Sequence, residues 1–366
     1  MKISELVVER YRQDATHGAA EILIVRVLTG EGVNGTGFLS AREQTSALYR
    51  SILRGVLAPA VTGLDPRLTT ECWSRMHASI GRRGGEGIVR ACIAAVDFAL
   101  WDIKGRLVGT PVSALFGSQR ERVPTYANCA HHLPVDQLAE RAAQYAARGH
   151  KALKIRGTRS FVTLDEATAR VQAVREAIGP DVRLMVDVNG SWDVETAIRQ
   201  LRRWERWDVF WLEEPVPPTD LPGYVRVRER AGSTWIAGGE QHVGLAEFRP
   251  LLDANAVDVV QPNAAITGGI TDWLPIHAYA TARGVPISPW NLQPIHLHLA
   301  AGLPNIMWIE YFMPDNALLE FQTRLFRGPA TREEVTDEGV FLLAPTAPGL
   351  GLELDPEVAD RTRVDE

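Results

Sequence analysis

Residues 182–241 begin with VRLMVDVNG, continue through VFWLEEP and end in TWIAGGEQ. Each of these three runs is short and apolar, which is typical of a strand that is buried on both faces. The segments between them, such as VETAIRQLRRWE, have the spacing of an amphipathic helix. Buried strands that alternate with helices predict a parallel sheet.

The same alternation extends from this stretch in both directions. Between residues 122 and 325 the apolar runs are VPTYANC, KALKIRG, VRLMVDVNG, VFWLEEP, TWIAGGEQ, VDVVQPN, VPISPWN and NIMWIEYF. Helical segments such as LDEATARVQAVREAIG and DWLPIHAYATARG lie between them. Eight strand–helix units in about 200 residues predict an α/β fold that closes into a (β/α)8-type barrel.

The flanking residues follow other patterns. Residues 1–38 alternate apolar and polar side chains twice, which predicts antiparallel strands joined by glycine turns. Residues 40–117 change to helical spacing, and those from 326 onward are rich in Pro, Gly and charge. We therefore predict an α+β capping domain at 1–121, a barrel at 122–325 and a C-terminal segment at 326–366 that completes the cap.

The first part of the chain also contains a glycine motif. Gly30-Glu31-Gly32-Val33-Asn34-Gly35 matches the G-x-G-x-x-G pattern of dinucleotide-binding folds. No helix is expected to open at the third glycine, and no strand–helix–strand unit surrounds the motif. We interpret it as a hairpin turn.

Composition excludes several classes of protein. The chain has 366 residues, a formal net charge of −6 and a pI near 5.9, which argues against nucleic acid or an anionic membrane as a partner. No apolar run approaches the roughly 20 residues that span a bilayer, and the first residues, MKISELVVERY, lack the apolar region of a signal peptide. The odd number of cysteines predicts reduced thiols at Cys72, Cys92 and Cys129. We expect a cytoplasmic protein.

Three carboxylates follow successive barrel strands. Asp187, Glu213 and Glu240 lie about one strand–helix unit apart, at the ends of the third, fourth and fifth strands. Neighbouring strand ends converge at one mouth of a barrel, where carboxylates without an ion would repel one another. An all-oxygen set of this kind suits a hard divalent cation, and Mg²⁺ better than zinc.

Further charged residues fall on the same strand ends. Lys154 and Arg156 end the second strand, and alternation places both on its interior side. Glu310 follows the apolar run NIMWI and requires a buried partner. Glu214 is expected to point away from the interior and to form a structural ion pair.

Together these motifs resemble the mandelate racemase subgroup of the enolase superfamily. The resemblance covers nearly the whole chain and rests on AAVDFALWDIKGRLVGTPVSALFG, KIR, VDVNG, WLEEP, GGEQ, QPNAAITGGITDW, IHLHLAAGLPN and the strand that carries Glu310. It implies an α+β cap on a modified (β/α)7β barrel.

The resemblance also implies roles for individual residues. The Mg²⁺ ligands would be Asp187, Glu213 and Glu240. Lys154 would bind the substrate carboxylate, Glu310 would hydrogen-bond it from the opposite side, and Asn189 would line the pocket. The shared chemistry is removal of the proton α to a carboxylate, which gives an enediolate stabilised by the metal and nearby cations.

The usual bases of the subgroup are replaced in this chain. Arg156 stands where a second lysine is usual, Asn263 replaces an Asp on the sixth strand, and Trp290 replaces a His on the seventh. These replacements argue against a two-base racemase. The base is Arg156 with a depressed pKa, Lys154 with Arg156 binding the carboxylate, or another residue such as His17 in a loop over the mouth. Asn263, Trp290 and His17 are the predicted substrate-binding residues beside Asn189.

Other histidines and arginines are weaker candidates. His242 follows Glu240 by two residues and could face the interior. His131 and His132 end the first strand, and one of them could face the substrate. Arg82 and Arg83 lie in a glycine-rich cap loop that could meet a polyhydroxy acid. His296 and His298 lie on a helix face and are expected to be structural.

The sequence thus predicts a metal-dependent lyase that dehydrates a sugar acid or another hydroxy acid, because this reaction requires only one base. A racemase, epimerase or cycloisomerase is the first alternative. A non-catalytic relative that binds a carboxylate with Mg²⁺ is the second. The expected partner is a small-molecule carboxylate, neither nucleic acid nor membrane, and the protein is expected to form a homo-oligomer.

Overall fold

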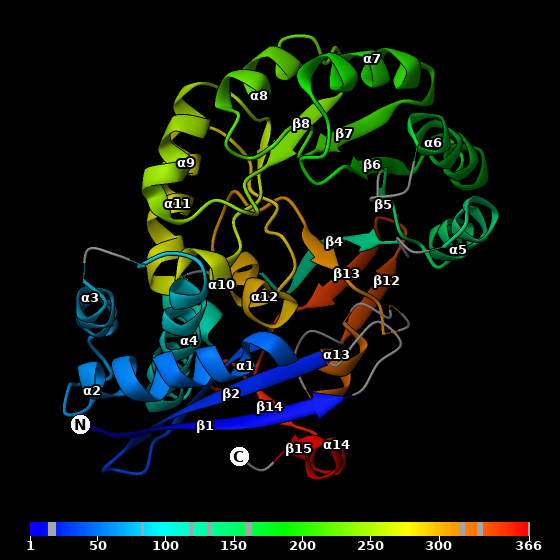
Figure 1. Ribbon diagram of the computed structural model, residues 1–366. Helices are drawn as coiled ribbons and strands as arrows, with labels where there is room; N and C mark the ends of the chain where they lie inside the picture. The colour runs from blue at the N-terminus through cyan, green and yellow to red at the C-terminus, as the bar shows by residue number, and fades with distance from the viewer. Residues whose placement is uncertain are drawn as a thin grey trace.

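The alternating N-terminal residues form an antiparallel sheet. The computed structural model describes residues 1–13, 20–81, 84–117, 120–129, 133–157, 163–314, 316, 319–327 and 332–364. In it this sheet has the order β15-β1-β2-β3, and Figure 1 shows β1 and β2 side by side. Its strands are β1 (Ile3–Gln13), β2 (Ala20–Thr29), β3 (Gly35–Arg42) and β15 (Arg363–Val364). The glycine motif joins β2 to the antiparallel β3, so the predicted hairpin turn is confirmed.

The helices of the cap pack on one another and on this sheet. They are α1 (Glu43–Ile52), the π-helical turn η1 (Leu53–Leu57), α2 (Ala58–Val61), α3 (Thr69–Ser79), α4 (Ile88–Val108) and η2 (Val112–Phe116). Helix α4 lies against β3, where Gly37 is needed because a Cβ there would approach the Ala95 carbonyl oxygen to 1.9 Å. No helix within the described residues has the length and apolar character required to cross a membrane.

Helix α4 also joins the cap to the barrel through a buried carboxylate. Asp97 accepts hydrogen bonds from the backbone N–H of Thr271 at 2.9 Å and from its hydroxyl at 2.6 Å. Burial raises the pKa of Asp97 to about 7, against the lowering effect of the bonds from Thr271. The neighbouring Trp101 donates to the same hydroxyl at 3.0 Å. The cap is thus held on the barrel by directed polar contacts as well as by apolar packing.

The predicted barrel is confirmed, and it is closed. Its strands pair in parallel around the ring, and β10 returns to pair with β4. They are β4 (Arg122–Asn128), β5 (Ala152–Arg156), β6 (Arg183–Asp187), β7 (Val209–Glu213), β8 (Trp235–Gly238), β9 (Val259–Val260) and β10 (Ile309–Tyr311). The seventh predicted strand is reduced to Ile287, which bridges Val260 on one side and Ile306 on the other.

Helices surround the outside of the barrel, as Figure 1 shows for α5 to α9. They are α5 (Val135–Ala147), α6 (Leu164–Ile178), α7 (Val194–Trp204), η3 (Glu205–Trp207), α8 (Leu221–Arg228), α9 (Gly244–Asp253), α10 (Ala264–Thr267), α11 (Ile270–Ala282) and α12 (Gln293–Gly302). Their apolar faces cover the outward side chains of the strands, so the strands are buried on both faces.

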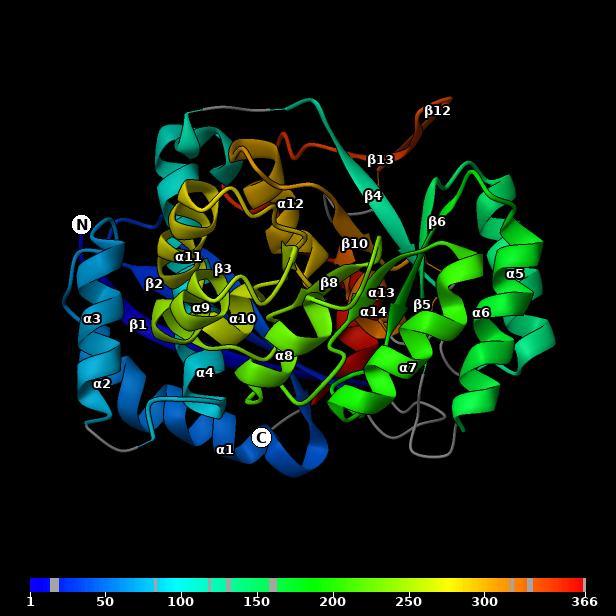
Figure 2. The same cartoon turned by 90° about the horizontal axis from the view of Figure 1, so that it is seen from above.

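The C-terminal segment is divided between the two parts of the molecule. Its elements are α13 (Glu320–Leu325), β11 (Phe326–Arg327), β12 (Glu333–Thr336), β13 (Gly339–Leu343), β14 (Glu353–Leu354), α14 (Pro356–Thr362) and β15. Strand β15 pairs with β1 in the cap sheet, but β13 pairs with residues 122–124 of β4 (Figure 2). Strand β4 meets β5 only at its far end, which leaves its first half as an open edge that β13 covers. The domain boundaries themselves stay a prediction.

Candidate active site

The interior of the barrel is built in layers. The lower layer is apolar and takes one side chain from each of β4 to β9, namely Tyr126, Ala152, Met185, Trp211, Ala237 and Val259. Side chains two positions further along each strand face the same interior. That second layer consists of Asn128, Lys154, Asp187, Glu213, Gly239 and Gln261, with Glu310 from β10, and all of its polar members are buried.

The three predicted metal ligands lie together at this level. One carboxylate oxygen from each of Asp187, Glu213 and Glu240 lies within 4.8 Å of the others. Burial raises the pKa of Glu213 to about 7 against the lowering effect of Lys154. Burial, followed by the charge of Asp187, raises the pKa of Glu240 well above its usual range.

This donor set fits a hard divalent cation. Oxygen atoms from three carboxylates match the preference of Mg²⁺, and Glu240 Oε2 has no hydrogen-bond partner among the described residues. The raised pKa values report carboxylates that repel one another and are poorly hydrated. A cation would relieve both effects, so the residues present are suited to hold one.

Lys154 lies between two carboxylates and is almost completely buried. Its Nζ is 2.6 Å from Glu213 Oε1 and 2.9 Å from Glu310 Oε1, and its side chain is 1% exposed. Burial lowers the pKa of Lys154, but the two glutamates outweigh this effect and raise it well above its ordinary value. In the metal-free protein Lys154 is therefore a fixed ammonium.

Besides Lys154, Glu310 is held by two groups that were not among the predicted site residues. Its Oε1 accepts from Asn128 Nδ2 at 2.6 Å, and its Oε2 accepts from the backbone N–H of Asn291 at 2.9 Å. The alternation of the first strand places Asn128 on its interior side, so the sequence contained a signal for this residue. A backbone donor such as the N–H of Asn291 has none.

Arg156 and Asn189 both contact the same carboxylate. Arg156 Nη2 lies 3.2 Å from Asp187 Oδ2, and its side chain is 25% exposed. Asn189 donates to Asp187 from its backbone N–H at 2.8 Å and from Nδ2 at 3.2 Å. Its φ of 44° lies in the left-handed region, which asparagine tolerates better than most residues. The structure thus brings Lys154, Arg156 and Asn189 to the carboxylate cluster, as predicted.

The prediction for Glu214 is wrong. Its side chain is buried beside Gln241, whose Nε2 donates to both of its carboxylate oxygens at 3.0 and 2.9 Å. Burial and the nearby Asp187 raise the pKa of Glu214 to about 7. The alternation that predicted an outward side chain stops here, because Glu214 has a φ of 46°. Gln241 is a further residue of this region that sequence reasoning missed.

Asn263 and Trp290 contact each other at the sixth and seventh strand ends. Asn263 Oδ1 caps helix α10 by accepting from the N–H groups of Ala265 at 2.7 Å and Ile266 at 3.3 Å. Its Nδ2 donates to the Trp290 carbonyl at 3.0 Å. These contacts give Asn263 a structural function, and the predicted contact of both residues with substrate stays a prediction.

The candidate histidines and arginines of the sequence fall into three groups. His296 and His298 are structural as predicted, since both lie buried in α12, bond to backbone groups and have pKa values that burial lowers to about 4. His242 is buried against Phe248, and burial lowers its pKa. The remaining candidates lie outside the described residues, namely His17, His131, His132, Arg82 and Arg83.

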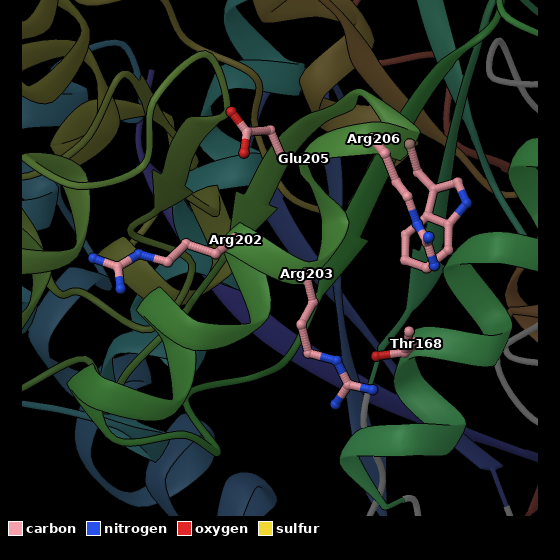
Figure 3. Close-up of a pocket in the computed structure, with 6 residues that line it drawn as sticks. Thr168, Arg202, Arg203, Glu205 and Arg206 are labelled. Atoms are coloured by element: carbon pink, nitrogen blue, oxygen red, sulfur yellow. The ribbon is translucent and has the colours of Figure 1, made fainter.

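A depression of about 580 Å³ lies elsewhere, on the outside of the barrel between α6 and α7 (Figure 3). Its lining includes the exposed arginines Arg202, Arg203 and Arg206. None of the predicted site residues lines it. The predicted site residues thus lie apart from this depression.

Comparison with known proteins places the chain in one family. Residues 11–117 match the N-terminal domain of the mandelate racemase/muconate lactonizing enzyme family, and residues 137–358 match the enolase C-terminal domain-like family. An L-talarate/galactarate dehydratase of Salmonella typhimurium is 33% identical over 84% of this chain and 77% of its own length. A 3,6-anhydro-alpha-L-galactonate cycloisomerase of Streptomyces coelicolor is 32% identical over 96% of this chain and 94% of its own length.

A solved structure extends the comparison to three dimensions. The crystal structure of an L-talarate dehydratase from a Polaromonas species, complexed with Mg and L-glucarate, has a TM-score of 0.86 and 33% identity. The match covers 99% of this chain and 98% of the other. The chain belongs to the mandelate racemase/muconate lactonizing enzyme family of the enolase superfamily.

Proposed function

We propose that this chain is an Mg²⁺-dependent enzyme that removes the proton α to a carboxylate and dehydrates a sugar acid or a similar hydroxy acid. The observation that carries the proposal is the buried cluster of Asp187, Glu213 and Glu240 beside the cations Lys154 and Arg156. The names of the relatives support it, since they include talarate/galactarate, arabinonate and galactonate dehydratases.

The residues divide the work by their charge and position. Asp187, Glu213 and Glu240 would hold the metal, which supplies positive charge to a substrate carboxylate that becomes more negative as the proton leaves. Lys154 adds a second, fixed positive charge from the interior. Glu310 holds that ammonium in place from β10, two strands away around the ring, at 2.9 Å.

We assign Arg156 to the position nearest the α-carbon. Lys154 is enclosed by two carboxylates, whereas Arg156 is 25% exposed and its Nε has no hydrogen-bond partner among the described residues. An arginine is a poor general base because its guanidinium stays protonated, so proton exchange must test which residue is the base. Elimination of a β-hydroxyl after proton removal requires only one such base.

A cycloisomerase is the second candidate. Two relatives, at 32% and 33% identity, are named as cycloisomerases that act on 3,6-anhydro-alpha-L-galactonate and D-galactarolactone. The compounds in these names are a sugar acid and a lactone of one, so the same cations and carboxylates would serve a reaction at the carbon beside their carboxyl group. The two candidates differ in whether water is lost.

The deciding experiment incubates the protein with a panel of aldonic and aldaric acids and their lactones, with Mg²⁺ or with EDTA. A dehydratase forms a 2-keto-3-deoxy acid, detected as its semicarbazone, only when Mg²⁺ is present. A cycloisomerase instead gives a product of unchanged mass with a new retention time. The matched control is Asp187→Asn, which should be inactive on the acids and on the lactones. Turnover that survives in EDTA would refute the proposal.

The assembly and location of the protein stay predictions. The homo-oligomer expected from the sequence is measured by size-exclusion chromatography with light scattering. The cytoplasmic location is measured by cell fractionation.

A further inference from the structure

The second layer of the barrel contains one polar side chain whose bonding is incomplete. Asn128, Lys154, Asp187, Glu213 and Glu310 each make at least one hydrogen bond or ion pair, at 2.6 to 3.2 Å. The exception is the side chain that follows β9. Gln261 is 0% exposed, and neither Oε1 nor Nε2 has a hydrogen-bond partner among the residues that the structure describes.

The position of Gln261 directs its amide to the barrel interior. Val259 belongs to the apolar lower layer, and Val260 packs outward among the helices. Alternation therefore returns Gln261 to the inside, on the layer of the metal ligands. Its own backbone is fixed, because its N–H donates to the Gly238 carbonyl at 2.9 Å.

The neighbouring strand leaves this part of the layer incomplete as well. Gly239, the member of the layer that follows β8, contributes no side chain. The next residue, Glu240, also has an unpartnered oxygen, Oε2. The unsatisfied polar atoms of Glu240 and Gln261 thus lie on adjacent strand ends, whereas the side that includes Lys154 and Glu310 is bonded internally. A buried amide without partners destabilises a fold, so such an amide usually has a partner in the working protein.

We propose that Gln261 is a specificity-determining residue whose amide binds a hydroxyl group of the hydroxy-acid substrate. An amide offers a donor at Nε2 and an acceptor at Oε1, and a hydroxyl group both accepts and donates. A carboxylate oxygen would satisfy only Nε2, and a water held by the metal would satisfy only Oε1. The substrate class in this inference rests on the proposed function, whereas the incomplete bonding of Gln261 does not.

The test replaces the amide by a thioether of similar size, Gln261→Met. The matched control is Gln200→Met, since Gln200 is equally buried but its Nε2 donates to the Leu164 carbonyl at 2.9 Å. Without metal or ligand, Gln261→Met should raise the melting temperature by a few degrees, because an unsatisfied polar group is replaced by an apolar one. Gln200→Met should lower it.

Ligand binding is measured by calorimetry with Mg²⁺ and two probes, tartronate and malonate, which differ by one hydroxyl group. Wild type should prefer tartronate, and Gln261→Met should lose that preference by about tenfold or more while it binds malonate and Mg²⁺ as wild type does. A lowered melting temperature, or a retained preference, overturns the proposal. A tenfold loss of Mg²⁺ affinity would also overturn it and assign Gln261 to the metal.

The outcome is separable from that of the proposed function. If no sugar acid is turned over but tartronate preference depends on Gln261, the reaction assignment fails and the hydroxyl contact stands. If wild type binds neither probe in the presence of Mg²⁺, the carboxylate site and the substrate role of Gln261 both fail.

Discussion

Replacement of Lys154 by methionine should destabilise the metal-free protein in a pH-dependent way. The ammonium lies 2.6 Å from Glu213 and 2.9 Å from Glu310, and all three side chains are at most 1% exposed. Removing one partner of a buried ion pair typically costs about 3–5 kcal/mol, because the other charge is left unpaired. Glu213 can reduce this cost by binding a proton.

The free energy of protonating Glu213 sets the pH dependence of this loss of stability. The pKa of Glu213 is about 7. In the wild type, where Lys154 lowers this pKa, protonation of Glu213 costs about 1.4 kcal/mol at pH 8 and almost nothing at pH 6, and this difference is the part of the loss that depends on pH. We expect Lys154→Met to lose between about 1.4 and 5 kcal/mol of unfolding free energy at pH 8, and clearly less at pH 6. Saturating Mg²⁺ should also reduce the loss, because a cation beside Glu213 replaces the missing charge.

The assay is urea denaturation at pH 6 and pH 8, with Mg²⁺ and with EDTA, followed by tryptophan fluorescence and circular dichroism. Lys151→Met is the matched control, because Lys151 precedes the same strand but is exposed. It should change stability little at either pH. A loss below about 1 kcal/mol at pH 8 for Lys154→Met, or an equal loss at both pH values, would refute the reasoning.

Three further predictions follow from the same structure. Mg²⁺ binding should release protons and tighten from pH 6 to pH 8, because the pKa values of Glu213 and Glu240 are raised. Calorimetry in two buffers of different ionisation enthalpy checks this, and a binding enthalpy that is the same in both buffers would contradict it. Arg156→Met should abolish exchange of the substrate α-proton with deuterated solvent, measured by NMR, while a carboxylate inhibitor still binds within several-fold; unchanged exchange would move attention to Lys154. Asp97→Asn should gain stability relative to wild type as the pH rises from about 4 to 7, because the pKa of Asp97 is raised from its ordinary value of 3.8 to about 7 and its ionisation weakens the native fold in that range. A pH-independent difference in urea midpoint would show that Asp97 does not titrate there.

Much of the barrel could be predicted because its strands are covered on both faces. Such strands must be apolar throughout, and the runs between residues 122 and 325 stand out for that reason. The seventh strand could not be predicted at its true length. Pro286 and Pro289 flank the bridging Ile287 and each lacks a backbone donor, so pairing is confined to that residue.

The candidate site was predictable where a charge follows an apolar run. A charged residue is unusual directly after an apolar run, so Asp187 and Glu310 stood out in the sequence, and their burial required partners. The uncharged residues gave weaker signals, since Asn128 and Gln241 resemble ordinary loop residues in the sequence. Glu214 was misplaced because alternation predicts side-chain direction only while the backbone remains extended.

The pairing of β15 with β1 has a consequence for how the protein is made. The cap sheet has its first strand at Ile3–Gln13 and its last at Arg363–Val364, with the whole barrel between them in the chain. During translation β1 is therefore synthesised long before β15. The barrel can begin to close while β1 still lacks that neighbour, so the cap sheet is completed only after β15 has been synthesised.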